Sequence, residues 1–222
     1  MEEDRAHCSQ GRPPKEIFTI GHGKRSWESF LELLRFHGIR KVVDVRAYPA
    51  SRKSPHFSRE HLEVSLAEAG IVYRWEGRAL GGFREPREGS RNISLRNPGM
   101  RGYADHMAGE EFRKAVSCLE EDAAHVCTAV MCAEIDPFHC HRGLLADYLT
   151  ARGVMVKHIR SKANPLIHRI SPLARVEGEV LVYDRSPTAW PIQEDTGAEN
   201  TQGLFTGPAG LPGAAAEQME EN

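Results

Sequence analysis

Patterns typical of strands and of helices alternate four times along residues 16–159, and this alternation limits the fold more than any other feature of the chain. Short β-branched, apolar runs typical of buried parallel strands are each followed by apolar residues at helical spacing. The strands are predicted at EIFTIG (16–21), KVVDVR (41–46), IVYRW (71–75), VCTAVMCAE (126–134) and VMVKHI (154–159). The alternation predicts a three-layer α/β fold, Rossmann-like, with a mostly parallel sheet and helices on both faces.

The helices between these runs carry recognisable start and stop signals. Ser26 and Ser58 are N-cap candidates for two of them, and a glycine ends each of those two. Helices are predicted at 27–38, 59–70, around 103–106, at 110–122 and at 141–153. Residues 77–102 are rich in Arg, Gly, Pro and Asn, and a loop of that length is usually functional or disordered. The segments LIHRISPLARV and GEVLVYD can add an edge hairpin or a terminal strand.

Composition indicates where the folded domain begins and ends and in which cellular compartment the protein is expected. Apolar residues make up 40% of the 222 residues, enough for one α/β domain, which we place at 16–184. Residues 1–15 and the Pro-, Gly- and Ala-rich residues 185–222 are predicted to be disordered. There is no run of eighteen apolar residues and no apolar stretch near the start, so neither a membrane span nor a secretory signal is expected. Five cysteines without framework spacing indicate reduced thiols in the cytoplasm.

Positive charge is concentrated in the middle of the chain. Thirteen Lys/Arg face eight Asp/Glu between Arg40 and Asp105, whereas ten face seventeen from His106 onward. A basic middle segment suits an anionic substrate such as a phosphate or a nucleic acid. A solvated, arginine-rich loop is the alternative. The sequence gives no indication of the oligomeric state.

Reactive side chains follow the predicted strands at their carboxyl ends, where parallel sheets bind ligands. His22, Asp44, Glu134 and Cys140 are the predicted catalytic residues. Cys140 stands at a helix N-terminus, which favours a thiolate nucleophile, and the carboxylates can act as general acid or base. Each also has a structural alternative, as a packed thiol or a capping carboxylate.

Side chains suited to hold a substrate accompany the catalytic candidates. Arginines can bind phosphate or carboxylate in a fork, and tyrosines can stack against a ring. The predicted substrate-binding residues are Arg46, Tyr48, Arg52, Arg101, Tyr103, His141 and Arg142.

No metal ion or other cofactor is predicted. Cys132, His139, Cys140 and His141 lie close together in the sequence, but their spacing fits no common zinc pattern, and Cys132 is interpreted as a packing residue. Neither a GxGxxG fingerprint nor a phosphate-loop lysine is present.

Five segments together resemble a known bacterial family. TIGHGKRSWESFLELLRFHGI, VVDVRAYPASRKSPHFS, LGGFREP, RNPGMRGYADHM and MCAEIDPFHCHR are similar to the family catalogued as domain of unknown function 488, over about residues 17–159. The resemblance implies a three-layer α/β fold with a polar site of unassigned activity, marked by His22, Asp44, Arg46, Glu134, Cys140, His141 and Arg142. A weaker similarity is to rhodanese-type sulfurtransferases, although the loop between Cys132 and Arg142 is longer and contains Pro137.

These observations lead to three hypotheses about function. The first is an enzyme of hydrolase or glycosylase type that acts on a nucleic acid or nucleobase, in DNA repair or base modification. The second is thiolate chemistry on a small molecule, sulfur transfer included, with Cys140 as the nucleophile and Arg142 as the anion anchor. The third is a non-catalytic binding module for an anionic ligand.

Overall fold

The computed structural model describes residues 15–50 and 54–186, which belong to one compact unit of the chain. Each predicted strand and helix is present, with ends that differ by a few residues. Its elements are β1 (Glu16–Gly21), α1 (Trp27–Phe36), β2 (Lys41–Asp44), the short 3-10 helix η1 (Pro55–Phe57), α2 (Arg59–Glu68), β3 (Val72–Trp75), α3 (Gly77–Leu80), α4 (Pro98–Met107), α5 (Glu110–His125), β4 (Thr128–Cys132), the 3-10 helix η2 (Pro137–His139), α6 (His141–Ala151), β5 (Met155–Ile159), β6 (Leu166–Ile167), β7 (Ala174–Glu177) and β8 (Val180–Tyr183).

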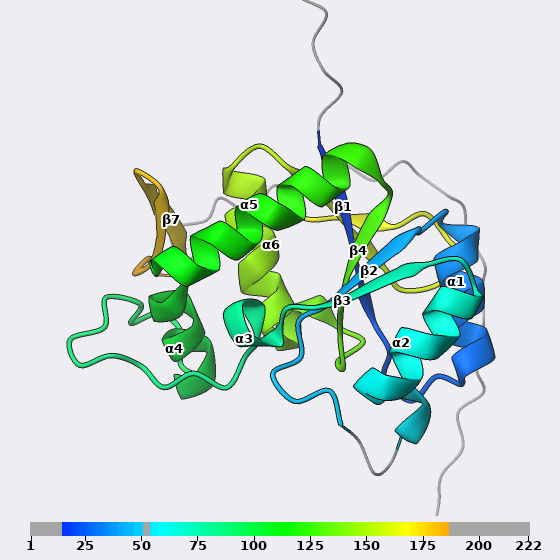
Figure 1. Cartoon of the computed structure of the whole chain (residues 1–222). Coiled ribbons are helices and arrows are strands. Elements are labelled where there is room, and N and C mark those ends of the chain that lie inside the picture. The colour runs from blue at the N-terminus through cyan, green and yellow to red at the C-terminus, as the bar shows by residue number, and fades with distance from the viewer. Residues whose placement is uncertain (1–14, 51–53, 187–222) are drawn as a thin grey trace, which may run out of the picture. The chain divides into compact units, whose positions relative to one another are not determined.

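One six-stranded sheet forms the centre of this unit, in the order β3-β2-β4-β1-β5-β6 (Figure 1). Strands β1 to β5 pair in parallel, and the two-residue β6 adds an antiparallel edge. The β7–β8 hairpin is a separate two-stranded sheet. In the register, Gly21 pairs with Cys132 and Asp44 with Met131, so the carboxyl ends of β1, β4 and β2 are level with one another.

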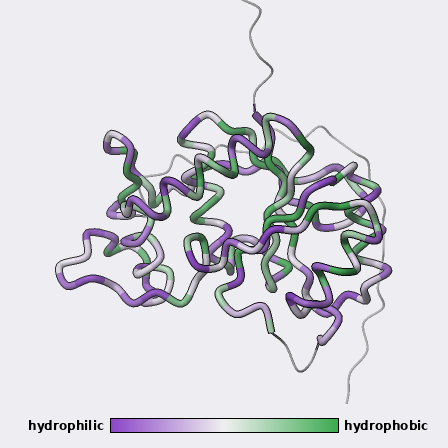
Figure 2. The backbone as a smooth tube through the Cα atoms, in the orientation of Figure 1, coloured by the Kyte–Doolittle hydropathy of each residue, from purple (hydrophilic) through white to green (hydrophobic). Residues whose placement is uncertain are grey.

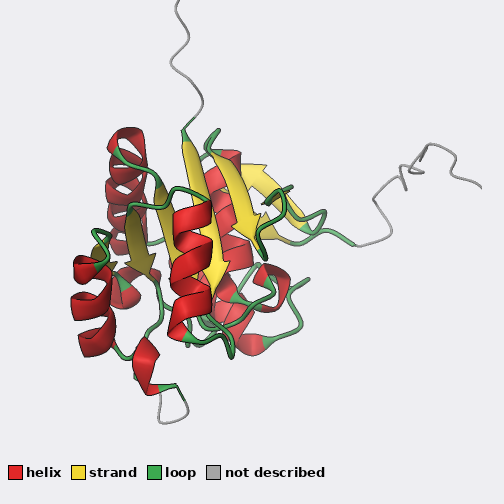
Figure 3. Cartoon of the chain, turned by 90° about the vertical axis from the view of Figure 1, so that its right-hand side faces the viewer, coloured by secondary structure: helices red, strands yellow, loops and turns green. Residues whose placement is uncertain are grey.

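Helices cover both faces of the sheet, which confirms the predicted fold class (Figures 1 and 3). Helices α1 and α2 pack on one face, in a buried cluster that includes Phe30 and Leu62. Helices α5 and α6 pack on the other, where Phe112 and Leu145 belong to a second cluster with residues of α3 and α4. Figure 2 shows the hydrophobic stretches running through the strands between these layers. Burial of these apolar side chains supplies the main driving force for the fold.

The predicted N-caps of α1 and α2 are confirmed. The Ser26 side chain accepts a hydrogen bond from the Ser29 amide, and Ser58 accepts one from the His61 amide. Each such bond satisfies an amide that has no partner within the helix and contributes about 1 kcal/mol.

Most of the arginine-rich segment is an irregular loop that joins α3 to α4 and is fixed by buried polar side chains. The Asp105 carboxylate accepts hydrogen bonds from the Arg87 amide, the Ser90 hydroxyl and the Asn92 amide group. Asn92 in turn accepts a hydrogen bond from the backbone of Tyr183 in β8. The loop is therefore held against the β7–β8 hairpin by side chains of its own sequence.

The predicted tails, 1–15 and 185–222, lie outside the described residues except for Lys15, Arg185 and Ser186. None of the helices in the described ranges has the length and apolar character needed to cross a membrane.

Candidate functional site

A cavity of about 570 Å³ opens at the carboxyl ends of the central strands. The chain continues from β1 toward β2 on one side of the sheet and from β4 toward β5 on the other, so the strand order reverses between the adjacent strands β1 and β4. Parallel sheets bind their ligands at such a reversal. The cavity is lined by His22, Arg46, Ala47, Tyr48, Ala50, Gly82, Phe83, Asn97, Gly99, Met100, Cys132, Ala133, Glu134, His139, Cys140 and His141.

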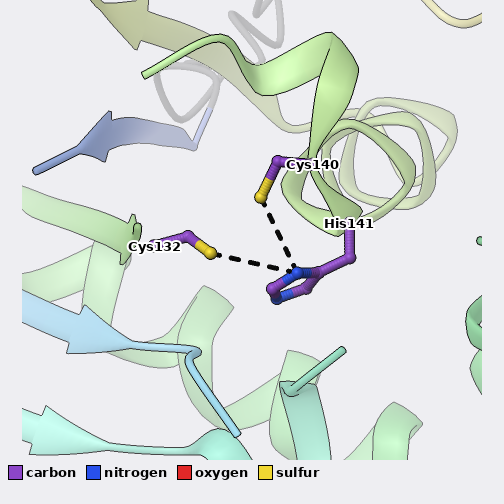
Figure 4. Close-up of side chains that lie close together, drawn as sticks. All are labelled: Cys132, Cys140 and His141. Carbon is purple, nitrogen blue, oxygen red and sulfur yellow. Dashed lines mark hydrogen bonds between the residues drawn. The ribbon is translucent and has the colours of Figure 1, made fainter. Parts of the chain in front are cut away.

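Two cysteines and a histidine meet at this cavity (Figure 4). Cys132 is the last residue of β4, Cys140 is the N-cap of α6, and His141 is the first residue of that helix. Nδ1 of His141 lies 3.7 Å from Sγ of Cys140 and 3.9 Å from Sγ of Cys132. We call these three residues the thiol cluster.

The imidazole of His141 is oriented by its other nitrogen. Nε2 lies 3.1 Å from the backbone oxygen of Val45, which can only accept, so Nε2 carries the hydrogen. Nδ1 is then free to take a proton from a thiol. A Cβ at Gly82 would lie only 3.0 Å from Nδ1, so the absence of a side chain there keeps this side of the ring open.

The surroundings of Cys140 stabilise its thiolate. Its pKa is lowered chiefly by a hydrogen bond from Cys132, and further by His141 and by the charge of Arg142, which together outweigh the opposing effect of burial. The position at the N-terminus of α6 acts in the same direction. The Cys132 thiol has a raised pKa, because it donates to Cys140 and is itself buried. These two shifts favour a thiolate at Cys140 over one at Cys132.

His22 and Arg46 also line the cavity. The Arg46 guanidinium is paired with Asp44, with 2.5 Å between Nη2 and Oδ2, and its Nη1 lies 3.3 Å from Nε2 of His22. The His22 ring stacks on Phe57, with 4.3 Å between ring centroids, and its Nδ1 lies 3.0 Å from the Gly23 oxygen. Burial and the charge of Arg46 lower the pKa of His22 to about 4, so this ring is neutral at physiological pH.

Arg142 is buried behind the cavity, and its side chain is 1% exposed. It donates to the backbone oxygens of Glu134 and Ile135 and, at 3.4 Å, to the hydroxyl of Thr19. The guanidinium therefore holds the β4–α6 loop in place. Its charge acts on Cys140 without the side chain lining the cavity.

The residues at the end of β1 bring the same loop close to the sheet. The Cβ that any other residue would carry at Gly21 would lie 1.8 Å from the Glu134 oxygen. The His22 and Gly23 amides donate to the backbone oxygens of Cys132 and Ala133. Glycine at position 21 is thus required by the close approach of two backbones.

The structure divides the predicted site residues into two sets. Those that line the cavity are His22, Arg46, Tyr48, Glu134, Cys140 and His141. Asp44 is fully buried, and its carboxylate is occupied by Arg46 and by the Tyr73 hydroxyl. Tyr103 is also buried and donates to the Leu80 oxygen, while Arg101 donates to the Leu95 oxygen. Arg52 lies outside the described residues.

Cys132 and Phe83 are among the lining residues that were not in the predicted set of site residues. Cys132 was interpreted as packing, although the rule that found Cys140, a reactive group at a strand end, applies to it equally. Phe83 is 87% exposed at the cavity, with its ring centroid 6.1 Å from that of Tyr48. Its φ of 61° is in the left-handed region, which costs a residue with a side chain free energy and which no sequence pattern reveals.

The thiol cluster also has the composition of a metal site. The two sulfurs and Nδ1 lie within 4.8 Å of one another, and two sulfurs with one imidazole nitrogen are ligands that suit a zinc ion. His139, the fourth candidate considered from the sequence, is 83% exposed and interacts with Asp136 instead.

A family comparison agrees with the resemblance seen in the sequence. No curated protein and no solved structure matches the chain significantly, and the weaker similarity to rhodanese-type sulfurtransferases has no support. The family model described as "Domain of unknown function DUF488" matches residues 26–149, from the N-cap of α1 to within α6. Because this match spans more than half of the 222 residues, the chain belongs to the DUF488 family.

Proposed function

We propose that this protein is an enzyme in which the Cys140 thiolate attacks an electrophilic atom of a small molecule bound in the cavity. The observation that carries the proposal is the position of Sγ of Cys140, which lines the cavity at the start of α6 and lies 3.7 Å from Nδ1 of His141. A thiolate, a base beside it and a second group that orients the base are the components of nucleophilic catalysis. Here the Val45 oxygen orients the base.

The walls of the cavity favour a substrate with both a polar and an apolar part. Arg46 and Asn97 offer hydrogen-bond donors, and the amides at the start of α6 favour negative charge. Tyr48 and Phe83 are exposed and lie beside each other, so they can cover an apolar or aromatic group.

The contacts of Asp44 and of the loop arginines give less support to a nucleic acid substrate. The Asp44 carboxylate is satisfied by Arg46 and Tyr73, as expected of a structural acid. Arg84 and Arg101 donate to backbone oxygens of their own segment, which leaves fewer free guanidinium groups for phosphate. Action on a nucleic acid or nucleobase stays a prediction.

A pure binding module is also less well supported. A binding site for an anion needs hydrogen-bond donors and positive charge. It has no need of a thiolate with a base 3.7 Å away.

Alkylation as a function of pH tests the proposal. Iodoacetamide should label Cys140 at pH 6, where an ordinary thiol, with a pKa of about 8.5, reacts slowly. The four cysteines from Cys118 to Cys140 share one tryptic peptide, since no Lys or Arg lies between Lys114 and Arg142. The label is therefore assigned with Cys118→Ser/Cys127→Ser as the background and Cys140→Ser in that background as the control. A rate for Cys140 that rises only near pH 8.5 would contradict the proposal.

A further inference from the structure

We infer that Cys132 is the second thiol of a reversible dithiol–disulfide couple with Cys140, and that the molecule reduced in the cavity is a low-molecular-weight disulfide. The inference rests on the proposed function, because Cys140 has to attack first. It goes further by giving Cys132 a chemical role and by naming the substrate class.

The position of Cys132 is the starting observation. A nucleophile and its base require one thiol, yet a second sulfur lies 3.9 Å from the same nitrogen of His141 and within 4.8 Å of the first sulfur. Cys132 and Cys140 are both nearly buried, and both line the cavity. A disulfide brings two sulfurs to about 2.05 Å, so rotation of the side chains toward each other has to close the remaining gap.

The other cysteines of the described part do not share this arrangement. Cys118 is exposed on α5. Cys127 precedes β4 at its amino end, and its sulfur lies 3.8 Å from the His37 oxygen. Both are therefore matched controls for a thiol outside the cavity.

The positions of the two cysteines indicate which sulfur attacks the substrate. Cys140 is the N-cap of α6, where the helix amides favour a thiolate, whereas Cys132 ends β4. Cys140 is then also the better leaving group, so the protein disulfide, once formed, is readily opened by an external thiol.

The reaction proceeds in two exchanges. The Cys140 thiolate attacks one sulfur of the bound disulfide, a bond forms between the two sulfurs, and the other half leaves as a thiolate that takes a proton from solvent. Cys132 then passes its proton to Nδ1 of His141 and attacks Cys140. The bond between Cys140 and the substrate breaks, and the second half leaves with the proton from His141. The substrate is reduced to two thiols, the cysteine pair is oxidised to a disulfide, and an external thiol reductant restores the pair.

The cavity can accommodate both halves of such a substrate. At about 570 Å³ it lies within the range of small-molecule sites. Tyr48, Phe83 and Met100 contribute apolar surface to the cavity lining, and Arg46 and Asn97 contribute polar groups. These lining groups can hold the half of the disulfide that leaves, and none of them takes part in the exchange at sulfur.

The experiment uses the full chain as Cys118→Ser/Cys127→Ser, reduced, treated with a chelator and mixed with oxidised glutathione. We expect two glutathione thiols to be released per chain and the intact protein mass to fall by two hydrogen atoms. Adding Cys132→Ser should stop the reaction at a stable glutathione adduct on Cys140, with loss of the second release. Adding Cys140→Ser should abolish both releases. A denatured sample treated in the same way controls for exchange that needs no folded site. Adding Cys8→Ser tests whether the remaining cysteine takes part, and it should change neither release.

The outcomes separate this inference from the proposed function. If the background chain and the Cys132→Ser chain both stop at the adduct, Cys140 is a nucleophile but Cys132 is not its partner, and the inference is overturned. If neither chain releases glutathione, the inference is overturned, whereas the pH profile of Cys140 alkylation decides the proposed function separately. The chelator-treated chain is also titrated with Zn²⁺. Stoichiometric, tight binding that is present in the protein as purified and that prevents exchange would identify the thiol cluster as a permanent metal site and overturn the inference as well.

Discussion

Two buried polar clusters lie on either side of Arg142, and they differ in how completely their groups are paired. The thiol cluster has contacts of 3.7 and 3.9 Å and borders a cavity. The second cluster, which we call the histidine chain, runs from Thr19 through His158 and His168 to Asp147. Its three hydrogen bonds are 2.7, 2.9 and 2.9 Å long.

Every link of the histidine chain fits a single assignment of hydrogens. His168 donates to the Asp147 carboxylate through Nε2, so its Nδ1 accepts from Nε2 of His158, and Nδ1 of His158 accepts from the Thr19 hydroxyl. Asp147 also accepts from the Tyr183 hydroxyl and the Ser171 amide. Such a fully satisfied network stabilises one packing arrangement and leaves no group free to react.

The comparison teaches how to distinguish a structural polar cluster from a reactive one in this fold. Both contain histidines that pack inside the domain, so burial does not separate them. Asp147 and His168 line a second cavity, of about 620 Å³, so a neighbouring cavity does not separate the clusters either. Of the two, only the thiol cluster places a nucleophile beside a base. The first prediction tests this distinction most directly.

Loss of the acid in the histidine chain should have the largest effect on stability. Asp147→Asn removes a buried charge that accepts from His168, Tyr183 and Ser171, and should lower the free energy of unfolding by about 3 kcal/mol. Cys140→Ser, at a position that is also buried, should lower it by less than about 1 kcal/mol. Urea denaturation of both variants measures the difference. Equal losses would show that the two clusters do not differ in structural importance.

The next largest effect is expected at the residue between the clusters. Arg142→Gln removes the charge that helps to lower the pKa of Cys140, as well as donors to Glu134 and Thr19. It should lower the free energy of unfolding by about 2 kcal/mol and also raise the Cys140 pKa. Arg160→Gln, at an exposed position, is the control. If stability fell while the alkylation profile stayed in place, the charge of Arg142 would have no influence on the thiolate.

A smaller, purely chemical effect is predicted for the base. His141→Gln removes a contribution that lowers the Cys140 pKa. A rise of one pKa unit reduces the thiolate fraction tenfold when pH lies below the pKa, a free-energy change of about 1.4 kcal/mol. The pH at which the alkylation rate of Cys140 reaches half its maximum should therefore rise by about one unit, whereas His139→Gln in the same loop should leave this midpoint in place. An unchanged midpoint would remove His141 from the proposed mechanism.

The smallest effect concerns the dependence of stability on pH. His22 has its pKa lowered from 6.5 to about 4, and His158 to about 3, both chiefly by burial. Between pH 6.5 and 4 the unfolded chain binds protons that the folded chain does not, so stability falls as the pH falls. His22→Gln should reduce the loss between pH 7 and 5.5 by about 1 kcal/mol, with exposed His125→Gln as the control. Parallel curves for His22→Gln and the unchanged chain would contradict the predicted role of His22.

Much of the fold could be predicted from the sequence because its signals are local. The β-branched run before Asp44 and the serine caps at Ser26 and Ser58 depend on neighbours a few residues away, and each specifies an element that the structure contains. The position of β6, two residues long, depends on pairing with β5 and has no comparable local signal.

The candidate site could be predicted only in part, for a related reason. The strand-end rule identified His22, Arg46 and Cys140 because topology alone brings strand ends together. It could not show that the Asp44 side chain turns toward Arg46 and Tyr73, since rotamers depend on long-range contacts. Tyr103 was predicted as a ring beside the arginines and is buried in α4, and Cys132 was interpreted as a packing residue although it lines the cavity.

The sequence by itself determined the α/β architecture of this protein and the end of the sheet at which its reactive side chains gather, because periodicity and capping act within one element. Tertiary structure alone decided which of those side chains face the cavity. Cys132 and Cys140 come together because parallel pairing of β4 with β1 and the packing of α6 fix both backbones. No local pattern encodes that convergence, because β4 pairs with residues of β1 more than a hundred positions away, although the two cysteines are only eight positions apart.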